Sequence, residues 1–443
     1  MRRWPRRAAS LRVSPRWRVF ALSALGAVAC SAAAASRHPT ASRREAPVAA
    51  RAPASARAAL RGPRTVRILL ATARGPVRVS SDGEWQIVAP DGQVVALTGS
   101  RESWVLARDG ERVSARREDS SPVSRRESTL IVRAMEPDGT LLFNGRRWRG
   151  ELLVSAAARG LQVVNRVPLD EYVRGVVPLE IGTSASADAA AVEAQAVAAR
   201  SYAVTHEAGP GRAYDMLATV ADQVYGGATA ETAVGNRAVD ATAGLVLRYG
   251  NRVVNAPYHA SCGGSTAEPQ DVWRTGPEPY LRRVSDGVPG TSRFYCDGAP
   301  RYRWTRSMTG DALRQAIARY VGTLSGAAAA TGRIRLVSVS DVTPAGRVAA
   351  LTIETDGRRL VLRGNEIRDA LRSPSGELLY STYFSVDAVA GAEGVQTLTL
   401  HGGGNGHGVG MCQSGAIGRA RAGQDFRTIL QTYYPGTVIG AIE

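Results

Sequence analysis

The pattern of apolar and polar positions divides the chain into two parts of different texture. Between residues 63 and 165, short apolar runs such as "TVRILLATA", "EWQIVA" and "TLIVRAM" alternate with Asp-Gly and Pro turns. This alternation is typical of strands joined by tight turns, so it predicts a β-rich unit over residues 63–165. No fixed-period repeat runs through the unit, which argues against a solenoid or a propeller.

From residue 166 to residue 443 helical spacing replaces simple alternation. "PLDEYVRGVV" predicts a short helix, and "SADAAAVEAQAVAARSYAVTHEA" predicts a long Ala-rich helix with one narrow face of small residues for close packing. "RVAALTIETDGRRLVLRG" predicts a hairpin, "NEIRDALR" a short helix, and "FRTILQTYYPGT" a final amphipathic helix. We therefore expect an α+β fold, in which a helix-and-strand domain over residues 166–443 follows the β-rich unit.

The chain begins with a segment that is typical of export. Residues 1–35 combine a basic start, the apolar run "VFALSALGAVAC" and the small residues "SAAAAS", which together predict a signal peptide rather than a membrane span. Cys30 follows "GAVA", a weak match to the lipoprotein pattern; it either carries a lipid or is removed with the signal. Residues 36–62, rich in Ala, Pro, Arg and Ser, predict a disordered tether. We expect a periplasmic or cell-envelope location, with no transmembrane span in the mature chain.

The net charge of +17 does not predict a nucleic-acid partner once its distribution is considered. Residues 1–60 hold 12 Arg against one Glu, a charge of +11, which leaves +6 for the remaining 383 residues. No basic stripe with interleaved aromatic residues and no zinc-finger spacing follows. We therefore exclude nucleic acid as the expected partner.

Three stretches in the second part of the chain carry a resemblance to a known family. They are "VVPLEIG…EAQAVAARSYA", "YHASCGGSTAEPQDVW…PYLRRVSDG" and "GHGVGMCQSGAIGRARAGQDFRTILQTYYPGT", with "DQVYGG", "RGNEIRDAL" and "YSTYFSV" as smaller pieces. In the same order they resemble the signature segments of the SpoIID/LytB family, named for stage II sporulation protein D and for an amidase enhancer. The resemblance covers residues 165–440 and is weak over the β-rich unit.

The resemblance implies a lytic transglycosylase that cuts the glycan strands of peptidoglycan and leaves anhydro-muramic ends. It implies that Glu180, the acidic residue of the "VVPLE" segment, is the single catalytic acid and base. An alternative interpretation makes Glu180 a capping carboxylate near the start of the long helix, where the helix field would favour its charged form. The alternative function is a non-catalytic wall-binding enhancer of an N-acetylmuramoyl-L-alanine amidase. Nothing in the sequence establishes sporulation over general wall turnover.

Further polar residues are candidates for substrate binding. The polar positions of the long helix are Gln195, Arg200, Ser201 and Tyr202, and Gln195 and Tyr202 share a face because they are seven residues apart. They could line a groove and bind sugar hydroxyls; alternatively, Arg200 pairs with a structural acid and Tyr202 packs in the core. The resemblance implies that His407 and Gln413 face the same groove as Glu180, although His407 could instead stabilise a turn.

The cysteines left after signal cleavage are an odd number, Cys262, Cys296 and Cys412, so no more than one internal disulfide can form. Three interpretations remain open. The first is a structural zinc site with His259, Cys262 and Cys296, and with His407 as a further candidate. The second is a Cys262–Cys296 disulfide, and the third is three inert small residues. No cofactor is required for the predicted reaction.

Overall fold

The computed structural model describes residues 64–120, 124–182, 185–325 and 332–442. The predicted export signal, the tether and Cys30 lie outside these residues. Among the helices that are described, none combines the length and the apolar character needed to cross a membrane.

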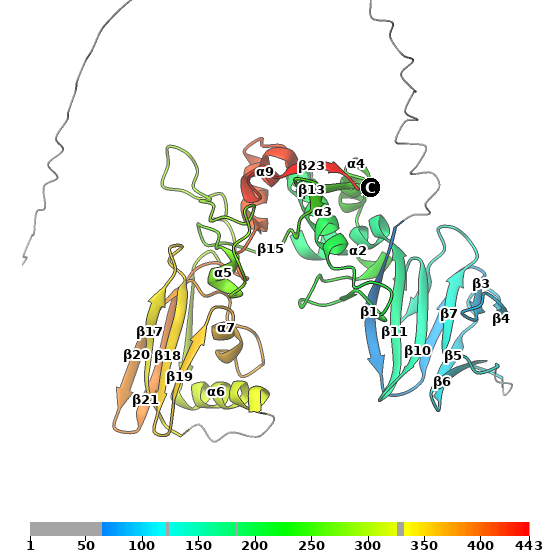
Figure 1. Ribbon diagram of the computed structural model, residues 1–443, viewed down its shortest axis with the longest axis horizontal. Helices are drawn as coiled ribbons and strands as arrows, with labels where there is room; N and C mark the ends of the chain where they lie inside the picture. The colour runs from blue at the N-terminus through cyan, green and yellow to red at the C-terminus, as the bar shows by residue number, and fades with distance from the viewer. Residues whose placement is uncertain (1–63, 121–123, 183–184, 326–331, 443) are drawn as a thin grey trace, which may run out of the picture. The chain divides into compact units, whose positions relative to one another are not determined.

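The first part of the described chain is built from strands. They are β1 (Thr65–Ala73), β2 (Val77–Ser81), β3 (Trp85–Val88), β4 (Val94–Thr98), β5 (Trp104–Asp109), β6 (Arg112–Arg117), β7 (Thr129–Ala134), β8 (Leu141–Phe143), β9 (Arg146–Trp148), β10 (Glu151–Ala157) and β11 (Gly160–Pro168). With the short strand β12 (Met216–Leu217) they form a seven-stranded sheet, β12-β1-β11-β10-β7-β3-β4, and a five-stranded sheet, β6-β5-β2-β8-β9. Figure 1 shows β1 to β7 in blue and cyan, with β10 and β11 in blue-green beside them.

Alternation of side chains explains why these segments form sheets around a core. In β1, Val66 and Ile68 are fully buried, and in β10 Leu152 and Val154 are fully buried, so alternate residues face inward. Inward residues from both sheets belong to one hydrophobic core. The predicted β-strand character of this region is confirmed.

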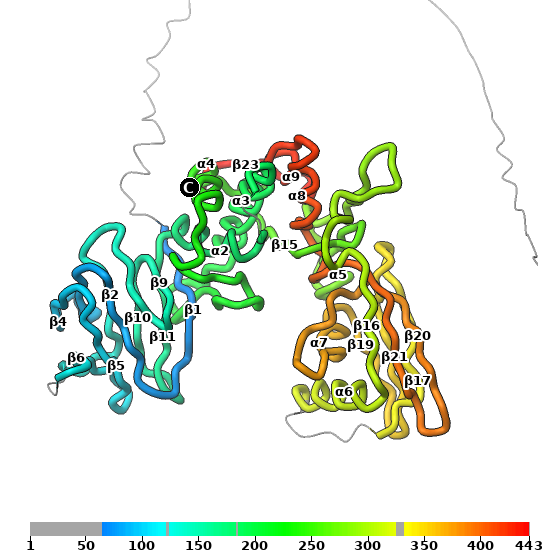
Figure 2. The backbone as a smooth tube through the Cα atoms, turned by 180° about the vertical axis from the view of Figure 1, so that it is seen from behind, coloured from blue at the N-terminus to red at the C-terminus, as the bar shows by residue number. Residues whose placement is uncertain are grey.

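Helices and short strands follow β11 and extend the same core. They are α2 (Leu169–Ile181), η1 (Ser186–Asp188), α3 (Ala189–Thr205), η2 (Gly227–Ala230), α4 (Ala233–Ala241), β13 (Leu245–Tyr249), β14 (Arg252–Val253), β15 (Tyr258–His259), α5 (Pro269–Val272), β22 (Met411–Cys412), α8 (Gln413–Arg421), α9 (Phe426–Tyr433) and β23 (Val438–Ala441). β23 pairs with β13, and β22 pairs with β15. Figures 1 and 2 show the red C-terminal segment returning to the green segment that carries α3 and α4.

Helix α3 is buried on almost all sides rather than along one narrow face. It packs against α2, α4, α8, α9 and β13, and both its small residues and its polar residues Gln195, Arg200 and Ser201 are buried. A helix that is apolar all round is a core helix. Alanine side chains let several elements approach its axis closely, so the prediction of a single packing face was too narrow.

A second hydrophobic core is formed by residues 304–402, which lie in the sequence between two segments that contribute to the first core. Its elements are β16 (Trp304–Thr309), α6 (Gly310–Ser325), β17 (Ile334–Val342), β18 (Val348–Thr355), β19 (Arg359–Arg363), α7 (Glu366–Ala370), β20 (Phe384–Gly391) and β21 (Gly394–Gly402). They form two three-stranded sheets, β16-β21-β20 and β17-β18-β19, and α6 packs against β16 and β21. The predicted hairpin and the short helix that follows it are β18, β19 and α7. The described chain thus has a mixed α+β fold.

Candidate functional site

Glu180 lies in the last turn of α2, on the face that this helix buries. Tyr172 and Val176 are fully buried residues of the same face, and Glu180 follows Val176 by four residues, one further turn along. Gly182 then ends the helix with a φ of 65°, a left-handed conformation that glycine adopts without strain. The sequence therefore brings one carboxyl group to the end of an apolar stripe.

The surroundings of Glu180 favour its protonated form. Burial raises the pKa of the carboxyl above its ordinary value, while hydrogen bonds with the Val224 N–H, 2.7 Å from Oε1, and with the Gln413 side chain lower it in part. The carboxyl also lies at the carbonyl end of α2, whose partial negative charge disfavours a carboxylate. The alternative interpretation of a cap on the long helix is wrong in position, because α3 begins only at Ala189.

The segment "DQVYGG", residues 222–227, reaches Glu180 through a close contact with α2. The Gly226 N–H donates to the Gly175 carbonyl at 3.1 Å, and a Cβ on Gly175 would lie only 2.6 Å from Cε2 of Tyr225. Glycine at position 175 is therefore what allows the segment to approach. The approach holds the Val224 N–H against the carboxyl.

Neutral hydrogen-bonding groups surround the carboxyl. The Tyr172 hydroxyl donates to Gln223 Oε1 at 3.1 Å, and Gln223 Nε2 donates to the Tyr258 hydroxyl at 2.7 Å. Burial raises the pKa of Tyr258 well above its ordinary value, and the charge of Glu180 raises it further. The same charge adds to the effect of burial on Tyr172 and Tyr202, which places these phenols near the carboxyl.

Gln195 and Gln413 meet beside Glu180. Gln413 Nε2 donates to Gln195 Oε1 at 3.3 Å, and both side chains are buried. The amide nitrogen of Gln195 is buried without a hydrogen-bond partner among the described residues. Leaving a buried donor unpaired is costly, so this nitrogen needs an acceptor, such as an enclosed water, that the described residues do not supply.

Of the other polar residues of α3, Tyr202 lies near Glu180, whereas Arg200 makes structural contacts in the core. The Tyr202 hydroxyl donates to Asp222 Oδ1 at 3.3 Å, and its ring stacks on His206 with centroids 3.8 Å apart. Arg200 Nε donates to Asp170 at 2.7 Å, and Arg200 Nη1 donates to the Leu245 carbonyl at 2.9 Å. Arg200 is fully buried in these contacts, which tie α3 to the start of α2 and to β13.

Ser201, like Arg200, makes structural contacts in the core rather than contacts with Glu180. Its hydroxyl accepts the Leu247 N–H at 2.8 Å and donates to the Val197 carbonyl at 2.7 Å. The side chain is fully buried. Its contacts therefore join α3 to β13 rather than to Glu180.

Burial and the hydrogen bonds of both ring nitrogens keep the imidazole of His407 neutral. The Val409 N–H donates to Nδ1 at 3.1 Å, so Nε2 carries the proton and donates to the Tyr258 carbonyl at 2.8 Å. Burial and, to a smaller extent, the charge of the nearby Arg368 lower the pKa of His407 to about 3. His407 thus fixes the backbone of Tyr258, whose side chain lies near Glu180.

The three cysteines lie together, but the histidine expected beside them does not. All three are buried free thiols, and Cys262, Cys296, Cys412 and Asp286 each place a ligand atom within 4.8 Å of the others. His259 is outside this group, since its Nδ1 donates to the Val409 carbonyl at 3.2 Å. Among the described residues, its Nε2 is buried and unpaired.

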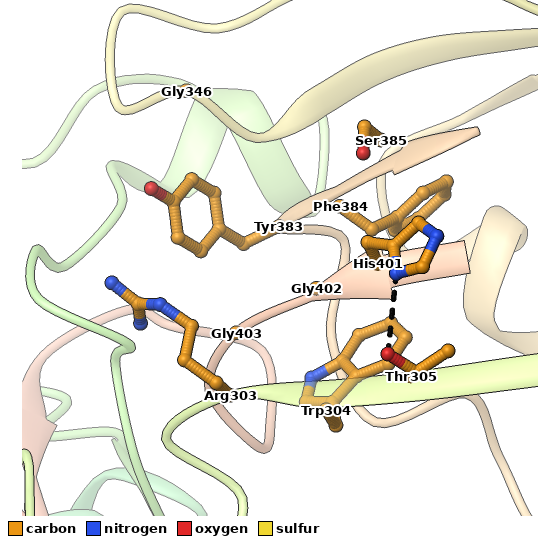
Figure 3. Close-up of a pocket in the computed structure, with 10 residues that line it drawn as sticks. All are labelled: Arg303, Trp304, Thr305, Gly346, Tyr383, Phe384, Ser385, His401, Gly402 and Gly403. Atoms are coloured by element: carbon orange, nitrogen blue, oxygen red, sulfur yellow. Dashed lines mark hydrogen bonds between the residues drawn. The ribbon is translucent and has the colours of Figure 1, made fainter. Parts of the chain in front are cut away.

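A separate pocket lies at the sheet β16-β21-β20. Its volume is about 680 Å³, and Glu180 is not among its lining residues. Figure 3 shows Trp304 and Tyr383 with Arg303 beside them, and the hydrogen bond of 3.2 Å between His401 and Thr305. Of these residues only Tyr383 lies in a stretch quoted from the sequence, "YSTYFSV", and none was a candidate site residue.

Several residues around Glu180 also went unrecognised as site residues in the sequence. The "DQVYGG" motif was a signal for Gln223 and Val224, but only as a segment. Tyr172 and Tyr258 gave no separate signal, because a buried tyrosine pattern looks the same in a plain core. Asp286 stands in the quoted "PYLRRVSDG" stretch, and the odd number of cysteines showed only that at least one of them is left out of any internal disulfide.

Two family models match parts of the chain. Residues 157–249, which carry α2 and α3, match the SpoIID family model, described as stage II sporulation protein. Residues 290–410 match a domain of unknown function, DUF8618. The first match covers Glu180, and the second covers the second hydrophobic core.

Three curated relatives cover most of the same chain. Stage II sporulation protein D of Bacillus subtilis is 30% identical over 296 residues, which are 63% of this chain and 76% of the relative. An uncharacterized protein of Brachyspira hyodysenteriae is 30% identical over 306 residues, 68% of this chain and 74% of the relative. The amidase enhancer of Bacillus subtilis is 28% identical over 299 residues, 60% of this chain but only 40% of that longer relative. These matches, together with the match of residues 157–249, which contain Glu180, show that the chain belongs to the SpoIID/LytB family.

Proposed function

We propose that the protein is an exported lytic transglycosylase that cleaves the glycan strands of peptidoglycan, with Glu180 as its single acid and base. The observation that carries the proposal is the environment of this carboxyl. Burial raises its pKa, so more of it is protonated near neutral pH than for an ordinary glutamate, as a general acid requires. No ion pair with Glu180 is formed by the residues that the structure describes.

The proposed reaction uses one carboxyl group twice. Glu180 protonates the glycosidic O4 as the bond between O4 and C1 of the muramic acid breaks. The resulting carboxylate takes the proton from the 6-hydroxyl of the same sugar while O6 bonds to C1, which closes the anhydro ring. No water is consumed, and Glu180 returns to its protonated state. Hydrolases instead need two carboxyl groups, ~5–5.5 Å or ~6.5–9.5 Å apart.

The groups around Glu180 suit a sugar ligand. Gln195 and Gln413 present buried amides, one of them with an unpaired donor, and Tyr202 and Tyr258 present phenols. Amide and phenol groups that are fixed in place can both donate hydrogen bonds to sugar hydroxyls and accept hydrogen bonds from them. His407 and the Tyr258 carbonyl support this arrangement from behind.

A second candidate function is enhancement of a wall amidase without catalysis. It is favoured by the similarity to a relative named amidase enhancer. In that case the protein would bind wall glycan and assist an N-acetylmuramoyl-L-alanine amidase, and Glu180 would be dispensable. The amidase is therefore the candidate protein partner.

The deciding experiment compares the wild type, Glu180→Gln and Glu193→Gln on peptide-free glycan strands, with products identified by mass spectrometry. Glu193 is a half-buried carboxyl on α3 and serves as the matched control. We expect anhydro-muramic ends from the wild type and Glu193→Gln, and a rate loss of about 10²–10⁴-fold for Glu180→Gln. Intact strands with the wild type, together with equal stimulation of an added amidase by the wild type and Glu180→Gln, would replace this proposal by the enhancer.

A further inference from the structure

Three cysteines and one aspartate from distant parts of the chain form a compact buried group. We call it the Cys₃Asp cluster; its members are Cys262, Cys296, Cys412 and Asp286. Cys262 follows β15, Cys412 ends β22, and the other two lie in the connection between α5 and β16. The four side chains are at most 1% exposed.

The ligand atoms of the Cys₃Asp cluster have the spacing of a tetrahedral metal site. Cys262 Sγ lies 3.5 Å from Cys296 Sγ and 3.6 Å from Asp286 Oδ2, and all four atoms lie within 4.8 Å of one another. Tetrahedral Zn–S bonds of ~2.3 Å separate two sulfur atoms by about 3.8 Å. The cluster therefore needs little movement to bind such an ion.

Backbone N–H groups point at two of the sulfur atoms. Cys262 Sγ accepts from the Gly264 N–H at 3.3 Å, while Cys412 Sγ accepts from the Cys262 N–H at 3.2 Å and from the Gly415 N–H at 3.3 Å. Cys412 is also the N-cap of α8, where the helix field stabilises a thiolate. These donors can stabilise sulfur ligands that become charged when they bind a cation, which burial alone disfavours.

The carboxylate of Asp286 is oriented by its own partners. Oδ1 accepts from the Tyr433 hydroxyl at 2.7 Å and from Arg419 Nη2 at 3.1 Å, which leaves Oδ2 directed at the cysteines. Metal ligands are commonly held in this way by a second layer of hydrogen bonds. A Cβ on Gly415 would lie 2.1 Å from Oδ2, so glycine there leaves room for the carboxylate.

The positive charge of the buried Arg347 lies beside the cluster and lacks a full set of hydrogen-bond partners among the described residues. Arg347 is 1% exposed and donates to the Cys262 carbonyl at 3.0 Å, yet its Nε and Nη1 have no hydrogen-bond partner among the described residues. A buried cation needs a compensating negative charge. Three thiolates and one carboxylate carry −4; a divalent cation together with Arg347 and Arg419 carries +4, so the occupied centre is neutral.

We propose that the Cys₃Asp cluster binds one zinc ion as a structural centre. Three sulfur ligands favour zinc over magnesium or calcium. Four protein ligands leave no open position for water, which is the arrangement of a structural site rather than a catalytic one. The ion joins three segments of the chain, and Cys412 is directly followed by Gln413, which contacts Glu180. The centre thus positions Gln413 in the site.

A surface pocket adjoins the cluster at Cys262, the side from which an ion would enter. A pocket of about 240 Å³ is lined by Cys262, Gly263 and Gly264, and it shares Arg303 and Tyr383 with the pocket of Figure 3. Arg303 Nη1 donates to the Gly263 carbonyl at 3.0 Å. A binding site needs such an entry path.

The first test measures the metal content of the full chain, expressed with zinc and purified without chelators, by mass spectrometry of the elements. We expect about one zinc per chain in the wild type and in two controls, Cys30→Ser and His259→Gln. In Cys296→Ser and Cys412→Ser the zinc content should fall about tenfold or more. Loss of zinc in His259→Gln would overturn the ligand set. So would zinc-free wild-type protein in which Cys262 and Cys296 form a disulfide, or in which Cys262, Cys296 and Cys412 all titrate as free thiols.

A second test does not depend on variants that could fail to fold. Zinc is removed from the wild type and replaced by Co²⁺, and the absorption spectrum is recorded. We expect the charge-transfer bands of cobalt–thiolate bonds and the visible bands of a tetrahedral ion, both removed by one equivalent of zinc. A spectrum of octahedral, oxygen-bound cobalt would overturn the proposal.

Discussion

Gln413 and Gln195 are joined by a hydrogen bond of 3.3 Å across 218 residues of sequence. Gln413 also bonds to Glu180 and lowers its pKa against the effect of burial. One side chain from the C-terminal part of the chain therefore connects the candidate acid on α2 to the buried face of α3. The first two predictions follow from this connection.

The rate of glycan cleavage should fall as the pH rises through the pKa of Glu180. A general acid must be protonated, and burial raises this pKa above the ordinary value for glutamate. We expect a single descending limb of kcat/KM that lies above the pH range of an exposed glutamate. A pH–rate profile on peptide-free strands measures it. A limb at or below the ordinary glutamate pKa would contradict the role of Glu180.

Replacing Gln413 by Ala should move the same limb to higher pH. The substitution removes a hydrogen bond that lowers the pKa of Glu180, so the protonated form persists further. We also expect a rate loss of about 10-fold, on the order of one hydrogen bond to a charged group. Gln431→Ala, at an exposed position of α9, is the matched control. An unshifted limb with Gln413→Ala would show that the contact is absent in solution.

Glu180→Gln should be more stable than the wild type near neutral pH. The pKa of Glu180 is higher in the folded than in the unfolded state. The protonated carboxyl therefore contributes its full stabilisation at pH values below the unfolded pKa, and this contribution is lost as the pH rises through the folded pKa. Glutamine carries no charge and escapes this loss. Urea unfolding at several pH values measures the difference, which should vanish in acid and grow towards neutrality. A constant difference would remove the case for a perturbed acid.

Arg200→Met should destabilise the protein without changing the KM for glycan of the folded fraction. Arg200 is fully buried and bonds to Asp170 and to the Leu245 carbonyl. Loss of such hydrogen bonds costs about 1.5–3 kcal/mol of unfolding free energy. Arg237→Met, at an exposed position of α4, is the control. A changed KM at full stability would instead support substrate binding by Arg200.

Gly415→Ala should disturb Asp286. The new Cβ would lie 2.1 Å from Asp286 Oδ2 and 2.2 Å from the Tyr433 hydroxyl, and overpacking of this kind typically costs about 1–3 kcal/mol. Gly276→Ala meets no atom within 4 Å and is the control. Thermal unfolding of both variants measures the effect. Equal midpoints would mean that helix α8 shifts to make room for the new side chain and would contradict the prediction.

The sequence pattern predicted those helices, strands and turns whose formation depends on residues close together in the sequence. Alternation in "TVRILLATA" gave strand β1, and the Asp356-Gly357 turn gave the hairpin of β18 and β19. The helix before Glu180 was predicted too short, because Pro178 usually ends a helix. In the structure α2 continues through Pro178 to Ile181, since packing of its apolar stripe outweighs the missing N–H.

The surroundings of the candidate site depend on distant contacts and could not be predicted in the same way. Glu180 itself was found through the family motif. Its partner Val224 lies 44 residues away, and no periodicity links them. Asp286 carries no motif of its own, because its meaning as a ligand comes only from Cys412 and Cys296, which the fold brings together.

The position of Gln413 also has a consequence for synthesis of the chain. When the ribosome has made residues 1–400, α2, α3 and Glu180 are all present, but the side chain that completes the setting of the carboxyl is not. Gln413, α8 and α9 arrive last and pack on α3, an element made more than 200 residues earlier. Contacts of such long sequence separation form late in folding. A truncated chain that stops before β22 therefore contains the whole acid-bearing helix but lacks Gln413, so only a chain that extends through α8 can form the complete surroundings of the Glu180 carboxyl.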